Sequence, residues 1–82
     1  MKALVTGASS GIGEKIAKEL AKRGYDIILV ARNEEKLKDV ASKIKTNTRI
    51  ITMDLSNKEN CEKLYEETKN EDIDILINNA GF

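Results

Sequence analysis

Four short apolar runs, separated by longer charged segments, constrain the fold of this 82-residue chain more than any other feature. They occupy residues 3–5, 27–31, 49–53 and 73–77. Their lengths are typical of strands, and the middle two are continuous enough to be buried on both faces of a sheet. Because strands that alternate with helical segments are joined by crossovers, the pattern predicts an α/β fold with a parallel sheet.

The three intervening segments have the spacing of amphipathic helices, and we interpret their apolar positions as core. The apolar residues that share one face in each segment are Ile12, Ile16, Ala17, Leu20 and Ala21; Leu37, Val40, Ala41 and Ile44; and, more weakly, Cys61, Leu64 and Tyr65. Gly24 follows two basic residues, which is a helix-stop signature. Asn33 is the expected N-cap of the second helix, and Ser56 or Asn57 that of the third.

Length and charge narrow the class of protein. A folded chain of this size exposes ~4,900 Å² against ~13,000 Å² when unfolded, so we expect one small domain with a thin core. Fourteen basic residues balance fourteen acidic ones, which argues against a nucleic-acid surface and an acidic tail. Hydrophobic residues at 40% and charged residues at 34% indicate a folded, soluble chain rather than a disordered one.

Residue types that are rare or missing exclude further classes. Cys61 is the single cysteine, so no internal disulfide forms, and a reducing compartment suits the chain. With no histidine, imidazole catalysis and His-ligated metal sites are excluded, and we predict no metal site. No apolar run has the length of a membrane span or of a signal-peptide core. We therefore expect a cytoplasmic location.

A glycine-rich turn follows the first predicted strand and opens the first predicted helix, with the sequence Thr6-Gly7-Ala8-Ser9-Ser10-Gly11-Ile12-Gly13. Gly7 allows a sharp turn, Gly11 lets a diphosphate approach the main chain, and Gly13 lets the helix pack close to the strand. The amide groups and dipole of the helix N-terminus attract the anion. Ordinary strand-to-helix turns also use glycines. A P-loop is excluded, because no Lys-Ser/Thr pair follows the last glycine.

The spacing Gly-x-x-x-Gly-x-Gly, with Thr6 before it, resembles the cofactor motif of the short-chain dehydrogenase/reductase family. Asp54 and Leu55, after the third run, and Asn78-Asn79-Ala80-Gly81, after the fourth, match two further elements of that family. The resemblance covers essentially the whole chain. It implies a Rossmann-like, doubly wound parallel sheet, here with four strands in the order 3-2-1-4 and three helices.

The resemblance also implies roles for individual residues. The cofactor diphosphate and the adjacent ribose would lie on the turn, which contributes Gly7, Ser9, Ser10, Gly11, Ile12 and Gly13. Asp54 would accept a hydrogen bond from the adenine amino group, with the Leu55 backbone beside it. Asn79 would bond near the adenosine ribose and brace the central strands. The alternative for Asp54 is a turn or cap residue, and that for Asn78 and Asn79 is an ordinary turn at a strand end.

Arg32 predicts the choice of cofactor. It lies nineteen residues after Gly13, at the end of the second strand, where an NAD-preferring site carries Asp or Glu. No carboxylate lies between Ile27 and Asn33, and a guanidinium suits a phosphate dianion. NADP(H) is therefore predicted over NAD(H), with Ser9 adding a hydroxyl donor. Some NADP-using members of the family carry a second basic residue just before the middle glycine, where this chain has a serine. The alternative role for Arg32 is that of a solvated residue at the start of a helix.

No catalytic residue is predicted. In the family, a Ser and a Tyr-x-x-x-Lys pair lie downstream of the Asn-Asn-Ala-Gly element. The string Tyr65-Glu66-Glu67-Thr68-Lys69 precedes that element and falls in the third predicted helix, so we interpret it as a coincidence. We expect the chain, residues 1–82, to be the N-terminal part of a dinucleotide-binding domain, with the remainder of the family fold absent.

The leading hypothesis is the cofactor-binding portion of an NADP(H)-dependent short-chain oxidoreductase, which moves hydride between nicotinamide and a carbonyl or alcohol carbon. Two alternatives are a stand-alone nucleotide-binding module and a decayed half-fold without turnover. The fourth strand would be interior in the family fold but ends this sheet, and an exposed apolar edge favours pairing with another chain. We therefore also expect self-association.

Overall fold

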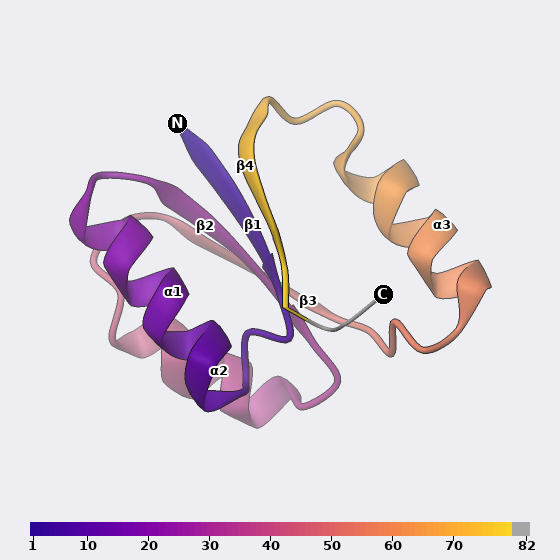
Figure 1. Cartoon of the computed structure of the whole chain (residues 1–82), viewed down its shortest axis with the longest axis horizontal. Coiled ribbons are helices and arrows are strands. Elements are labelled where there is room, and N and C mark those ends of the chain that lie inside the picture. The colour runs from indigo at the N-terminus through magenta and orange to yellow at the C-terminus, as the bar shows by residue number, and fades with distance from the viewer. Residues whose placement is uncertain (80–82) are drawn as a thin grey trace.

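The computed structural model describes residues 1–79, in which strands and helices alternate (Figure 1). The elements are β1 (Lys2–Thr6), α1 (Gly11–Lys22), β2 (Asp26–Ala31), α2 (Glu34–Ser42), β3 (Thr48–Thr52), α3 (Lys58–Thr68) and β4 (Ile73–Asn78). The strands form one parallel sheet in the order β3-β2-β1-β4. The predicted α/β class and strand order are confirmed.

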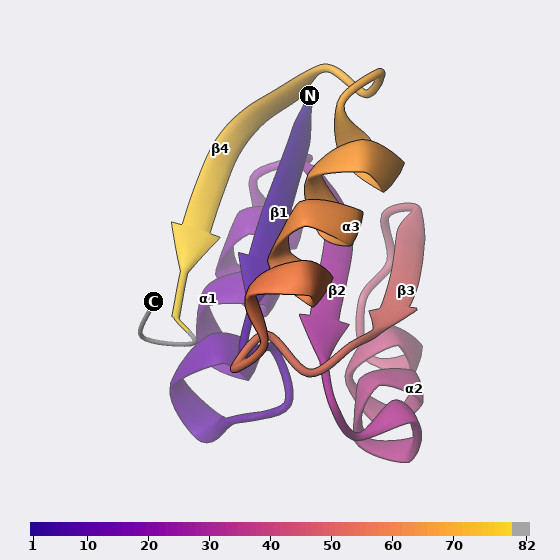
Figure 2. The same ribbon diagram turned by 90° about the vertical axis from the view of Figure 1, so that its right-hand side faces the viewer.

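Two helices cover one face of the sheet and a third covers the other, as Figure 2 shows by placing α3 in front of the strands and α1 and α2 behind them. The α1–α2 face has the larger core. Its buried residues are Ala3, Val5, Ala8, Ala17, Ile27, Leu29, Ala31, Leu37 and Val40. β2 lies inside the sheet and is buried on both faces from Ile27 to Ala31, as predicted. The larger part of the core therefore lies between the sheet and helices α1 and α2.

The α3 face is thinner, and here several sequence predictions are wrong. Its buried residues are Leu4, Ile28, Val30 and Ile51, against which Leu64 of α3 packs. β3, expected to be buried on both faces, buries Ile51 alone because it is an edge strand. Tyr65 and Cys61 are exposed rather than core, because α3 turns Leu64 and the buried Thr68 toward the sheet instead.

The helix ends follow the predicted capping residues. Asn33 caps α2 by accepting from the Lys36 amide, and Asn57 caps α3 by accepting from the Glu59 amide. Gly24, just beyond α1, has a φ of +93°, which favours glycine. Ile44 was expected in the second helix but lies beyond its end at Ser42; it still packs, half-buried, against the α1–α2 core.

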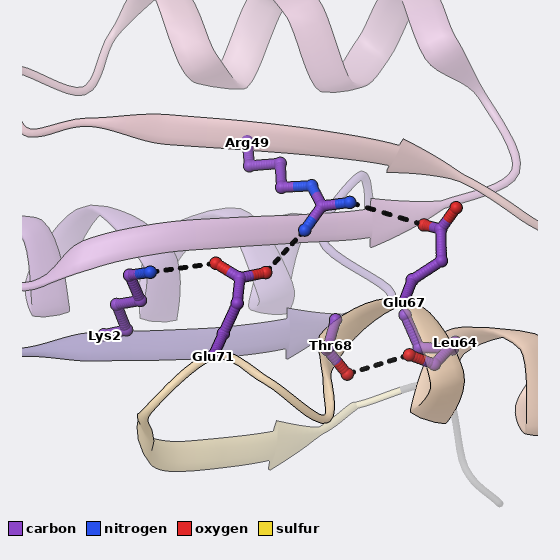
Figure 3. Close-up of polar contacts among 6 residues, drawn as sticks. All are labelled: Lys2, Arg49, Leu64, Glu67, Thr68 and Glu71. Carbon is purple, nitrogen blue, oxygen red and sulfur yellow. Dashed lines mark hydrogen bonds and ion pairs between the residues drawn. The ribbon is translucent and has the colours of Figure 1, made fainter.

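An ion-pair cluster at the amino end of the strands joins α3 and its following loop to the sheet (Figure 3). Glu71 pairs with Lys2 of β1 at 2.9 Å and with Arg49 of β3. Arg49 also approaches Glu67 of α3 at 3.6 Å. Thr68 is tied within α3 by its hydroxyl, which donates to the Leu64 carbonyl at 2.8 Å. One carboxylate thus bridges two strands that β2 separates.

β4 lies at an edge of the sheet and pairs with β1 alone among the described strands. A register shift between Lys2 and Ala3 lets Asp74 accept from the Lys2 backbone amide at 2.9 Å. Leu76 is 65% exposed, which agrees with the expected apolar edge. Within residues 1–79, no helix combines the length and apolar character needed to cross a membrane.

Candidate cofactor-binding site

The turn after β1 is built around Gly7. Its φ of +63° lies in the left-handed region, and a Cβ there would lie 3.2 Å from the backbone of Asn79. The next amide, that of Ala8, donates to the Val30 carbonyl at 3.1 Å. The chain therefore leaves β1 sharply and is tied at once to the end of β2, as the sequence predicted for this glycine.

Gly13 and Gly11 have opposite surroundings. A Cβ on Gly13 would lie 2.2 Å from the carbonyl oxygen of Gly7, so a side chain cannot be accommodated without moving backbone. The predicted close packing is confirmed, although the helix packs against the turn rather than the strand. A Cβ on Gly11 would meet no other described atom within 4 Å. Gly11 therefore presents bare backbone to open space at the start of α1.

Ser10 organises the turn from within. Its hydroxyl donates to the Gly7 carbonyl at 2.9 Å and accepts from the Gly13 amide at 3.0 Å, which caps α1. The Asn79 side-chain amide donates to the Ser10 hydroxyl at 2.8 Å and to the Gly7 carbonyl at 3.2 Å. Ser10 and Asn79, both predicted to bind cofactor, thus brace the turn that would hold it. Ala80 and Gly81 of the predicted motif lie outside the described residues.

Two amide groups at the start of α1 are available to an anion. The first four amides of a helix have no intrahelical acceptor. The Ser10 amide donates to Gly7 and the Gly13 amide to the Ser10 hydroxyl, which leaves those of Gly11 and Ile12 without an acceptor among residues 1–79. The Ile12 side chain was expected in the core, but it is 68% exposed. As the second residue of α1, Ile12 lies where the helix has not yet reached the sheet.

A cavity of about 560 Å³ lies at the carboxyl ends of β1, β2 and β3, the end toward which the arrowheads in Figure 2 point. Six of the ten predicted cofactor residues line it: Gly7, Ser9, Ser10, Arg32, Asp54 and Leu55. Gly11, Ile12, Gly13 and Asn79 do not line it but belong to or brace the adjoining turn. Dinucleotides bind outside the carboxyl ends of strands in open α/β sheets, and this volume suits a small ligand.

The cavity also has lining residues that the sequence analysis missed: Val30, Ala31, Asn33, Lys36, Met53 and Ser56. Most of them are next to a predicted residue in the sequence, so predicting the strand ends also indicated approximately where they lie. No sequence pattern separated Lys36 from the other exposed lysines, because its place beside Arg32 depends on how α2 follows β2 in space. Both side chains are exposed.

Asp54 occupies the turn between β3 and α3. Its carboxylate accepts from the Ser56 hydroxyl at 2.7 Å and from the Ser56 amide at 2.9 Å. These bonds hold the pKa of Asp54 below its ordinary value; burial opposes them, and the charge of Arg32 adds the smallest lowering contribution. Asn60 donates to the Asp54 carbonyl at 2.8 Å, so α3 holds the loop in place. Asp54 is therefore an ionised acceptor in a fixed turn.

Tyr65 and Lys69 lie away from this cavity. Lys69 pairs with Glu66 at 2.8 Å, and neither Tyr65 nor Lys69 lines the cavity at the strand ends. A larger hollow, about 960 Å³, runs along α3 and includes Tyr65, but it contains none of the predicted cofactor residues. Within residues 1–79, no three or more Cys, Asp or Glu side chains gather where they could hold a metal ion.

The residues present fit a dinucleotide. The open space at Gly11, with the two adjoining amides, accepts a diphosphate without a clash. The β2–β3 side of the cavity offers a guanidinium, which can bind an anionic or hydroxyl group, and an ionised carboxylate, which can accept from an amino group. One cavity therefore places both kinds of group beside the glycine-rich turn.

Comparison with known proteins gives matches along the whole chain. The sequence profile described as short chain dehydrogenase matches residues 1–82. A very-long-chain 3-oxoacyl-CoA reductase of Coccidioides immitis is 50% identical over 86 residues, which cover 96% of this chain and 25% of that protein. The 3-oxoacyl-(acyl-carrier-protein) reductase FabG of Rickettsia prowazekii is 49% identical over 78 residues, which cover 95% of this chain and 32% of that protein.

Solved structures give the same result. A short-chain dehydrogenase from Sphingobium yanoikuyae in complex with NADPH has a TM-score of 0.89 and 35% identity, covering 99% of this chain and 34% of that one. The chain thus spans between a quarter and about a third of the length of these three proteins.

Proposed function

The chain belongs to the short-chain dehydrogenase/reductase family, and on this premise we propose that it is the NADP(H)-binding part of an oxidoreductase. The nicotinamide, when bound, would exchange hydride with a carbonyl or alcohol carbon. The residues of this chain bind and orient the other half of the cofactor. We take residues 1–82 as the N-terminal part of a dinucleotide-binding domain, acting in the cytoplasm, where a free cysteine such as Cys61 is stable.

The proposed roles follow from position. The amides of Gly11 and Ile12 donate to the diphosphate, for which Gly7 and Gly13 shape the turn and Ser10 and Asn79 brace it. Ser9 adds a hydroxyl at the cavity wall. Asp54 accepts from the adenine amino group through lone pairs that Ser56 leaves free, with the Leu55 backbone beside the ring.

One observation carries the preference for NADP(H): Arg32 lines the cavity at the end of β2, and no carboxylate of β2 or of the β2–α2 turn does. An NAD-preferring site needs an acidic residue there to accept from both ribose hydroxyls. The neighbour described as bound to NADPH supports the same preference.

Titration of NADPH and NADH into the 82-residue chain tests this proposal. We expect NADPH to bind about ten- to a hundredfold more tightly, because a charge-assisted contact is worth ~1.5–3 kcal/mol. Arg32→Asp removes the guanidinium and adds a charge that repels the phosphate. The affinity for NADPH should therefore fall, while the affinity for NADH should be unchanged or higher. Lys45→Asp makes the same charge change on an exposed loop residue and should alter neither affinity.

Two results would contradict it. Tighter binding of NADH by the parent chain would show that the site does not select the phosphorylated cofactor. Equal losses of NADPH and NADH in Arg32→Asp, with circular dichroism unchanged, would show that Arg32 does not discriminate between them.

We also propose that the chain associates with itself through β4. The edge strand carries Leu76 at 65% exposure and lacks a second neighbouring strand among the described residues. Unpaired edges of this kind template pairing with another chain. Sedimentation should show concentration-dependent dimers or larger species, which Leu76→Lys should reduce; a stable monomer at millimolar concentration would contradict this proposal.

A further inference from the structure

A second basic side chain lies beside Arg32 in the cavity. Lys36 is in the first turn of α2, and it lines the same cavity as Arg32 and Asn33. Among residues 1–79, neither Arg32 nor Lys36 forms an ion pair. Both cations line one cavity, so an anion bound there is attracted by both of them.

Lys36 occupies a position that does not favour a cation. The first turn of a helix is the positive end of its dipole, where acidic residues are stabilising and basic residues are not. Its backbone is held there, because the Lys36 amide donates to the Asn33 side chain at 3.1 Å. A residue that breaks a local preference in a fixed position is a candidate for a functional role.

The acidic residues nearby do not neutralise this corner. Glu34 pairs with Lys38 at 3.3 Å and accepts from the Thr52 hydroxyl at 3.5 Å, and Glu34 does not line the cavity. Asp54 does line it, and its charge interacts with that of Arg32, but it is a single carboxylate. The cavity wall therefore carries two cations against one carboxylate, which leaves a net positive charge.

We infer that Lys36 is a second specificity residue for the phosphorylated ribose, binding the 2′-phosphate from α2 while Arg32 binds it from the end of β2. This inference rests on the proposed function. On the far side of the cavity, the Ser10 hydroxyl is committed to the glycine turn and adds no charge. The second positive charge for the phosphate therefore comes from the helix.

Binding of two half-ligands isolates the contact. Adenosine 2′,5′-bisphosphate carries the extra phosphate, whereas AMP does not. Lys36→Met should lower the affinities for the bisphosphate and NADPH roughly fivefold. It should leave the affinities for AMP and NADH within about twofold of the parent values. Lys36→Arg should retain the preference because it keeps the charge. Lys45→Met is the matched control: Lys45 is exposed, does not line the cavity and forms no ion pair with the described residues, so all four ligands should keep their affinity.

The outcomes separate this inference from the proposal on which it rests. If the parent chain prefers the bisphosphate and Lys36→Met keeps that preference, Lys36 has no part in selection and the inference is wrong. The same holds if Lys36→Met weakens AMP and the bisphosphate equally. If the parent chain shows no preference for the bisphosphate over AMP, both the inference and the proposed NADP(H) site fail.

Discussion

The two ends of the candidate cofactor site are built differently. At the glycine turn, residues 7–13, the groups offered to a ligand are backbone amides, and Ser10 and Asn79 fix the turn through hydrogen bonds of 2.8–3.2 Å. At the β2–α2 corner, residues 32–36, the groups offered are the exposed side chains of Arg32 and Lys36. The first end is rigid and nearly uncharged, and the second is charged and solvated.

This difference separates affinity from selectivity. A diphosphate is common to NADH and NADPH, so a site made of backbone amides serves both cofactors and does not distinguish between them. The 2′-phosphate distinguishes the two cofactors, and exposed side chains that make few contacts with the fold can change without unfolding the protein. We therefore expect substitutions in the glycine turn to affect both cofactors and substitutions at the corner to affect one.

The largest effect should come from Gly13→Ala. The new Cβ would lie 2.2 Å from the Gly7 carbonyl oxygen, so α1 or the turn must move. We expect a destabilisation of ~2–3 kcal/mol, a Tm lower by roughly 10–20 °C, and loss of both cofactors. Thermal unfolding measures the change in Tm, and titration measures the affinity for each cofactor. An unchanged Tm would show that the helix does not pack against the turn as described.

Gly11→Ala is the matched variant within the same turn. Its Cβ meets no other described atom within 4 Å, so the fold and the Tm should be nearly unchanged. The methyl group would occupy the space left for the diphosphate, and we expect NADPH and NADH to weaken by the same factor, about tenfold or more. A change in the ratio of the two affinities would contradict the division between the two ends.

Ser10→Ala should have a smaller effect, on stability more than on selectivity. It removes the N-cap of α1 and one of the two acceptors of the Asn79 side chain, which we expect to cost about 1 kcal/mol and lower the Tm by roughly 4–8 °C. Ser9→Ala is the control, because the Ser9 hydroxyl makes no hydrogen bond to the described residues. If both variants had the same Tm, the bracing role of Ser10 would be wrong.

The smallest effect on the cofactor should come from the opposite end of the strands. The pKa of Glu71 lies below its ordinary value, chiefly because Lys2 donates a hydrogen bond to its carboxylate and carries a positive charge. Arg49 lowers this pKa further, and partial burial opposes both effects. Because the folded pKa is the lower one, the ion pairs stabilise the chain above the unfolded pKa, about 4.3, and this contribution is lost as pH falls through the folded pKa.

Glu71→Gln should therefore lower the Tm by roughly 2–8 °C at pH 7 and flatten the loss of stability below about pH 5. The ratio of NADH to NADPH affinity should stay within twofold of the parent, because Glu71 is remote from both ends of the site. Thermal unfolding between pH 3 and pH 7, together with one titration of each cofactor, provides the measurement. A changed ratio would show that the amino end of the sheet is coupled to the site.

The sequence predicted the strands, the helices and the helix caps because periodicity and capping chemistry are local, whereas the strand order came from the resemblance to the family. It predicted the geometry of Gly7 and Gly13 because few residues other than glycine fit such turns. It failed where burial depends on distant neighbours: Ile12 and Tyr65 have helical spacing that suits a core, but within residues 1–79 no layer covers them. Lys36 was missed for the same reason, since its place beside Arg32 depends on how α2 follows β2 in space.

Amide chemical shifts followed by NMR during titration with NADPH and with NADH test the central division most directly. We predict that the amides of Gly11 and Ile12 shift with both cofactors to a similar extent at saturation. The amides of residues 32–36 should shift strongly with NADPH and much less with NADH. Equal shifts at residues 32–36 with both cofactors, or shifts concentrated along α3 with none in the glycine turn, would contradict the account.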